Sequence, residues 1–157
     1  MSETELRPEL CNCLAIRQAA RHVTQFYDQY LAPVGLRTTQ FSMLAKLKRL
    51  GPMPIKVLAR ELVMDRTTLG RNILPLEREG LIAIEPGRTD RRSKEVRLTD
   101  AGATRLKAGV KKWALAQAQF EAGFGSRRTV ELRALLKAVT ESELGGAPRA
   151  EPRQGAA

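Results

Sequence analysis

The chain has 157 residues, of which 43% are hydrophobic and only 4% are aromatic, and its net charge is +10. This length suits one ordinary domain whose core is mostly Leu, Val, Ile and Ala. The basic excess favours a polyanionic partner, and the lack of an apolar run of spanning length predicts a cytoplasmic protein that does not insert into a membrane.

Residues that usually carry catalysis or bind metals are scarce. The sequence has no P-loop, no nucleophile-elbow motif and no zinc-protease motif. Its only cysteines, Cys11 and Cys13, and its single histidine, His22, make a poor metal set. We therefore expect no enzymatic activity, no metal site and no cofactor.

Two helices are predicted at the start of the chain. Apolar residues spaced by three and four predict a helix from Glu9 to Leu31. Its apolar stripe consists of Cys13, Ile16, Ala20, Val23, Tyr27 and Tyr30. Pro33 and Gly35 end this helix, and Thr38 or Thr39 can cap a second helix that runs to the break at Gly51.

The pattern in the middle of the chain predicts a winged helix-turn-helix. A short helix over 54–62 and a tight link precede a second helix over 66–79, which Asp65 can cap and Gly80 can end. Two strands follow, over 81–85 and 95–98, with a basic loop between them. Pro75 removes one backbone hydrogen bond from the second helix.

The end of the chain is predicted to be helical and then disordered. Thr99 caps a long helix that reaches about Phe124, and a last helix ends near Leu144. The tail over 145–157 is rich in Gly, Pro and Ala, which predicts disorder. The fold class is therefore mainly α with a small β-hairpin wing.

Candidate DNA contacts follow from this arrangement. The second helix of a helix-turn-helix enters the major groove, so its first half must point polar side chains outward. Those outward residues are Arg66, Thr67, Thr68, Arg71 and Asn72. The wing adds Arg88, Asp90, Arg91, Arg92 and Lys94, and an arginine-rich loop suits a narrow minor groove. Asp90 is placed to accept hydrogen bonds from the guanidinium of Arg92.

The segments "LARELVMDRTTLGRNILPLEREGLI" and "DRRSKEVRLTDAG" resemble the MarR family of transcriptional regulators. The resemblance implies one domain over 1–144, with dimerisation helices at about 9–34 and 99–144 and a DNA-binding lobe at about 38–98. It also implies a homodimer that binds a pseudo-palindromic operator in double-stranded DNA. Such proteins usually repress genes and are released by small aromatic or lipophilic ligands or by oxidants.

The same resemblance suggests two sensing sites. The family's ligand cleft maps here to Arg17, Arg21, Phe26, Phe41 and Trp113. A branch that senses organic peroxides has a reactive cysteine early in the first helix, which maps to Cys13, with Tyr27 as a supporting tyrosine. Thr38 and Arg17 stand where that branch has aromatic residues. Cys13 is thus either a redox sensor or a packing residue, because free cysteine is often only a small apolar side chain.

An alternative function of another class is a winged-helix module that binds RNA or protein. The basic wing and the polar face of the second helix argue against a purely protein partner. A preference for duplex DNA over single-stranded RNA separates the two hypotheses.

Overall fold

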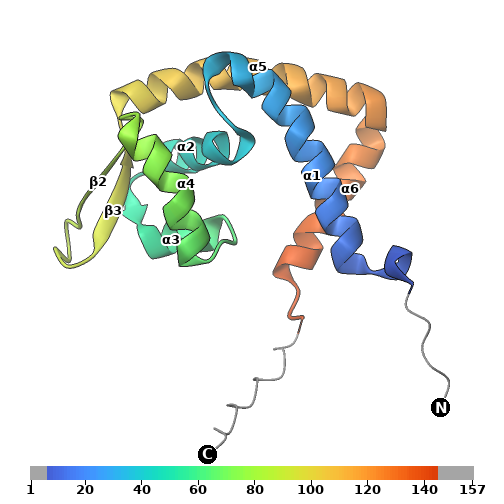
Figure 1. Ribbon diagram of the computed structural model, residues 1–157, viewed down its shortest axis with the longest axis horizontal. Helices are drawn as coiled ribbons and strands as arrows, with labels where there is room; N and C mark the ends of the chain where they lie inside the picture. The colour runs from blue at the N-terminus through green and yellow to red at the C-terminus, as the bar shows by residue number, and fades with distance from the viewer. Residues whose placement is uncertain (1–6, 145–157) are drawn as a thin grey trace, which may run out of the picture. The chain divides into compact units, whose positions relative to one another are not determined.

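The computed structural model describes residues 7–144, and Figure 1 traces its elements. In chain order these are η1 (Pro8–Leu10), α1 (Asn12–Leu31), η2 (Ala32–Val34), α2 (Thr38–Leu50), β1 (Met53–Pro54), α3 (Ile55–Glu61), α4 (Arg66–Arg78), β2 (Ile82–Pro86), β3 (Lys94–Leu98), α5 (Asp100–Phe124) and α6 (Ser126–Glu141). The helical fold with a small sheet confirms the predicted fold class. The predicted tail over 145–157 lies outside the described residues.

The chain forms two compact units, and the boundary between them falls inside α5. The first unit runs to Ala118 and holds the helix-turn-helix and the sheet. The second begins at Gln119 and holds the last six residues of α5 and all of α6. Among residues 7–144, no helix is both long enough and apolar enough to cross a bilayer.

The sheet has one more strand than the sequence predicts. β3 lies in the middle, pairing antiparallel with β2 on one side and with β1 on the other. The β1 partners are Met53 with Val96 and Pro54 with Glu95. Two residues are too few to show the alternation that predicts a strand, so β1 becomes visible only through its pairing with β3. The β2–β3 hairpin projects from the edge of the lobe formed by α2, α3 and α4 (Figure 1).

The start of α2 is capped differently from the prediction. Thr38 lies inside the helix as its first residue, and its backbone N–H and its hydroxyl both donate to Oδ1 of Asp28, each over 2.7 Å. The capping acceptor therefore comes from α1. This contact fixes the end of α1 to the start of α2, across the turn that Gly35 makes at φ 70°.

The core of the first unit lies between the helices of the lobe and the sheet. Its fully buried members include Leu44 of α2, Leu58 of α3, Leu69 and Leu76 of α4, and Val96 of β3. The helix α4 thus buries an apolar face on the side opposite its predicted outward polar residues. Leu50, which continues the spacing of α2, is half exposed because the helix ends there and the chain turns at Gly51.

The second unit is held together by short-range contacts around the α5–α6 corner. Phe120 and Phe124 lie with ring centroids 5.6 Å apart, and the guanidinium of Arg128 sits 4.2 Å above the Phe124 ring. Arg133 forms an ion pair with Glu121 over 3.7 Å. The predicted last helix ends three residues early, at Glu141.

Candidate nucleic-acid interface

The link between α3 and α4 is a tight and strained turn. Val63 has φ 52°, a backbone conformation that β-branched residues rarely adopt. The N–H of Met64 donates to the carbonyl of Ala59 over 2.8 Å, which closes the turn on α3. This connection sets the direction in which α4 leaves the lobe.

Asp65 caps α4, as the sequence predicts. Its Oδ1 accepts the backbone N–H of Thr68 over 2.8 Å, and its Oδ2 accepts the Thr68 hydroxyl over 2.6 Å. The hydrogen bond from the Thr68 hydroxyl is the largest cause that lowers the pKa of Asp65, and the bond from the Thr68 N–H adds to it. The Thr68 hydroxyl therefore donates its hydrogen bond within the protein, which leaves only the lone pairs of its oxygen to accept a hydrogen bond from DNA.

This cap predicts a pH dependence for α4. Because the pKa of Asp65 is lower in the folded chain than in the unfolded chain, the cap stabilises the fold at neutral pH. That contribution is lost as the pH falls from about 4 through the lowered pKa. Urea unfolding of the wild type and of Asp65→Asn at several pH values measures it.

Asparagine keeps a capping oxygen without a titrating proton. We expect the stability difference between the two proteins to shrink as the pH falls, with Asp65→Ala less stable than either at neutral pH. A difference that stays constant with pH would contradict this role of Asp65.

The polar face of α4 is largely open to solvent. Arg66, Thr67 and Arg71 are exposed, whereas Leu69 and Ile73 are buried on the opposite side. Asn72 is half-buried, and its Nδ2 donates to the Thr68 carbonyl over 2.8 Å. To contact adenine through both its amide oxygen and its nitrogen, Asn72 must turn away from the helix or use its second N–H. Arg66, Thr67 and Arg71 need no such change.

The tip of the wing is a folded turn. The N–H of Gly87 donates to the carbonyl of Ser93 over 2.7 Å, and the N–H and hydroxyl of Ser93 both donate to the Asp90 carbonyl. A Cβ on Gly87 would lie 2.6 Å from both the Asp90 carbonyl oxygen and the Ser93 hydroxyl, so the turn requires glycine there. The basic side chains of the wing are thus carried by a defined backbone.

Asp90 acts on the backbone of this turn. Its Oδ1 accepts the backbone N–H of Arg92 over 2.9 Å. The sequence predicts a bond to the Arg92 guanidinium, but in the structure the Asp90 carboxylate accepts a hydrogen bond from the main chain instead. A side chain two residues away is well placed for this local turn. The Arg92 side chain is exposed.

One arginine of the wing forms an ion pair within the hairpin. Arg97 on β3 pairs with Glu85 on β2 through Nη2 and Oε1 over 2.8 Å. The hydrogen bond from Arg97 lowers the pKa of Glu85, and the charge of Arg97 adds to the effect. The wing residues left with exposed cationic side chains are Arg88, Arg91, Arg92 and Lys94. Together with Arg66 and Arg71 they give the lobe a cationic surface.

The residues predicted for a ligand cleft separate into three places. Phe41 is buried and stacks on Trp113 with centroids 6.2 Å apart, while Phe26 packs edge-on against Tyr27 at 5.5 Å. Arg17 and Arg21 are exposed along α1. The structure therefore brings Phe41 and Trp113 together but not the arginines.

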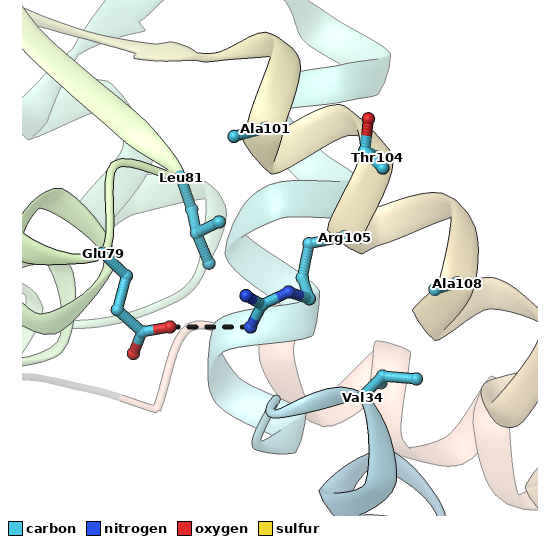
Figure 2. A pocket seen from close by; sticks show the side chains of 7 residues that line it. All are labelled: Val34, Glu79, Leu81, Ala101, Thr104, Arg105 and Ala108. Carbon is cyan, nitrogen blue, oxygen red and sulfur yellow. Dashed lines mark ion pairs between the residues drawn. The ribbon is translucent and has the colours of Figure 1, made fainter.

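Two cavities of the described residues lie elsewhere. The first has a volume of about 470 Å³ and lies between η2, the end of α4 and the start of α5. In Figure 2 the guanidinium of Arg105 points across this cavity to Glu79, 3.5 Å away, with Leu81, Ala101 and Thr104 on its walls. The second, of about 390 Å³, lies beside α4. Neither cavity is lined by the five predicted cleft residues.

Cys13 and Tyr27 are far apart within one chain. Both lie on α1, fourteen residues from each other, which corresponds to about 21 Å along a helix axis. Cys13 is exposed, whereas Tyr27 is buried and its hydroxyl donates to Oε1 of Gln117. Cys11 caps α1, with Sγ accepting the N–H of Leu14 over 3.4 Å. Tyr27 therefore does not contact Cys13 within one chain.

Comparison with known proteins identifies the chain. Residues 36–94 match the MarR family. The transcriptional regulator YwoH of Bacillus subtilis is 36% identical over 84 residues, which cover 54% of this chain and 61% of that protein. The transcriptional activatory protein BadR of Rhodopseudomonas palustris is 33% identical over 103 residues, which cover 62% and 59%. The chain thus spans about three fifths of the length of these two relatives.

A solved structure extends the match to nearly the whole fold. The M. tuberculosis transcriptional regulator MosR in complex with DNA is 36% identical to this chain, with a TM-score of 0.71. The match covers 82% of this chain and 96% of that one. The chain therefore belongs to the MarR family of transcriptional regulators.

Proposed function

We propose that this protein is a sequence-specific regulator that binds duplex DNA as a homodimer in the cytoplasm. The observation that carries the proposal is the geometry of the lobe. A capped helix with an exposed Arg66, Thr67 and Arg71 stands beside a folded wing tip with exposed arginines. The DNA in the related MosR structure supports the same partner.

Both parts of the lobe fit DNA dimensions. An α-helix with its side chains is about 10–12 Å across, close to the width of about 12 Å of the major groove. With α4 in that groove, Arg71 can donate to guanine and Thr67 to bases or phosphates. With α4 so placed, Arg91 and Arg92 of the wing would enter an adjacent minor groove, where a narrow groove has a strongly negative potential.

Exposed apolar side chains support the homodimer. Leu10, Ile16, Leu135 and Leu136 are between 43% and 70% exposed in the single chain, although each lies in or next to a terminal helix. A second copy that covers these side chains removes apolar surface from water. Two-fold symmetry also matches two half-sites on a duplex. We propose that the terminal helices interleave and that the operator is pseudo-palindromic.

Binding over a promoter would repress transcription by blocking it, and we propose repression as the resting activity. Release would come from a small aromatic or lipophilic effector near Phe41 and Trp113, whose rings stack. Oxidation of the exposed Cys13 is the alternative trigger. We propose both triggers from the family resemblance and from the positions of Phe41, Trp113 and Cys13 in the structure.

The salt dependence of DNA binding tests the role of the wing. If Arg92 contacts phosphate or lies in the minor groove, Arg92→Ala should reduce the slope of log affinity against log salt by about 0.9 for each subunit bound. Fluorescence anisotropy of labelled duplex at several salt concentrations measures this slope. Arg49→Ala is the matched control, because it removes the same charge at an exposed position at the far end of α2.

The two variants separate a local contact from a general charge effect. An equal loss of slope in Arg92→Ala and Arg49→Ala, or no loss in either, would remove Arg92 from the interface.

Single-stranded RNA of the same length serves as competitor. Stronger binding to that RNA than to the duplex would favour the RNA-binding module.

A further inference from the structure

The second cavity lies along one flank of α4 and joins three helices. Its walls come from α1, from the first turn of α2 and from α4. The polar side chains that matter here are Asp28, Arg37, Thr39, Arg71 and Asn72. We call it the α2–α4 cavity. None of the DNA contacts predicted from sequence lies on α2, so Arg37 and Thr39 have no role in the function described so far.

The charges in this cavity are unbalanced. Arg37 and Arg71 are both exposed, and no ion pair involves either of them within residues 7–144. The one carboxylate on the walls, Asp28, uses Oδ1 to cap α2 through the N–H and hydroxyl of Thr38. The lining thus contains two arginines and one carboxylate, and that carboxylate already accepts two hydrogen bonds. The cavity suits an oxyanion that accepts hydrogen bonds from arginine.

The position of the cavity indicates which oxyanion fills it. Arg71 belongs to the outward face of α4, and Asn72 and Pro75 continue around the helix into the cavity. A helix that enters the major groove fills most of its width, so the sugar-phosphate strands lie against both flanks of that helix. A cationic cavity on one flank then faces a phosphate strand directly.

We propose that the α2–α4 cavity binds a backbone phosphate of the operator, with Arg37 at the N-cap of α2 and Thr39 in its first turn as the contacts. Arg71 lies between this phosphate and the base edges. The contact would fix how deeply and at what angle α4 enters the groove, which is a positioning role without base preference. The inference rests on the proposed function, because it requires α4 to lie in the major groove.

The test compares Arg37→Ala with wild type in the full-length protein. We expect the salt slope to fall by about 0.9 for each subunit, equally on an operator duplex and on a random duplex. Base preference, measured as the ratio of the two affinities, should stay unchanged. Arg37→Lys should keep the slope, because it keeps the charge. Arg49→Ala lies about 18 Å away along α2 and is the control for net charge.

The outcomes separate this inference from the proposed function. If wild type binds duplex DNA with a steep salt slope but Arg37→Ala has the same slope, the phosphate contact is wrong and the DNA-binding function stands. If wild type does not bind duplex DNA, the proposed function fails first. A thermal midpoint equal to that of wild type verifies that Arg37→Ala is folded.

A free inorganic anion is the alternative occupant of the α2–α4 cavity, because it offers the same oxygen acceptors as a backbone phosphate. Inorganic phosphate is titrated into the DNA-free protein and followed by calorimetry. We expect no saturable binding at millimolar phosphate. Saturable binding that Arg37→Ala abolishes would assign the cavity to a small anionic ligand and overturn its assignment to the DNA backbone.

Discussion

Gly102→Ala should destabilise the protein by about 3 kcal/mol, at the upper end of the range for overpacked sites. Gly102 lies in the first turn of α5, against the start of the wing. A Cβ there would lie 2.0 Å from the backbone oxygen of Leu81 and 2.8 Å from Cδ1 of Leu98. The nearer atom is main chain and cannot rotate away. For a chain of this length the change corresponds to roughly 6–12 °C in Tm.

The contact also links the wing to α5. The N–H of Gly102 donates to the Thr99 hydroxyl over 3.0 Å, and that hydroxyl donates to the Gly80 carbonyl over 2.6 Å. A side chain at 102 would push α5 away from this network and tilt the hairpin. DNA affinity should therefore fall even at temperatures where the variant is folded.

Gly123→Ala is the matched control in the same helix. A Cβ at Gly123 meets no atom within 4 Å, so this change should be neutral or stabilise the helix by less than about 1 kcal/mol. Thermal unfolding followed by circular dichroism compares the two variants. Equal Tm values for Gly102→Ala and Gly123→Ala would contradict the close packing of α5 on Leu81.

Leu136→Glu should give a monomer that binds the operator at least about 100-fold more weakly than wild type. Leu132, Leu135, Leu136 and Val139 form one stripe along α6, and Leu136 is 44% exposed. A charge in the middle of a dimer interface is desolvated without a partner. Once the two lobes separate, the second half-site no longer benefits from the high effective concentration that a dimer provides, which is worth a factor of 10²–10⁴.

The control for this variant is Ala134→Glu. Ala134 is also exposed on α6 and lies about 200° around the helix from Leu136. It gains the same charge on the opposite side of the stripe, so the dimer should persist. Sedimentation and DNA titration distinguish the two. A Leu136→Glu protein that keeps its helical content and remains dimeric would show that this face of α6 does not form the interface.

Local signals in the sequence are sufficient to predict α4. Asp65 caps α4 as expected, Gly80 ends it at φ 68°, and Leu69, Ile73 and Leu76 form its buried face. Each of these features depends on residues within one or two turns of each other. Sequence spacing therefore predicts them without knowledge of the rest of the fold.

Features that depend on distant segments were not predicted. The cap of α2 comes from Asp28, ten residues earlier, and β1 is defined only by its pairing with β3. The pair of Arg97 with Glu85 joins residues twelve positions apart across the hairpin, so it follows from the β2–β3 register and not from spacing along the chain. The α2–α4 cavity combines side chains from three helices, so spacing along the chain gives no sign that Arg37 lies near Arg71.

Selection of binding sites from a library of random duplex DNA tests whether the protein binds DNA sequence-specifically as a dimer. We expect an enriched motif with two-fold symmetry whose half-sites lie about one helical turn apart. Selection with Arg71→Ala should lose preference at one position in each half-site, at a cost of about 1–3 kcal/mol on the original motif. Recovery of duplexes without any shared motif would contradict a sequence-specific dimeric regulator.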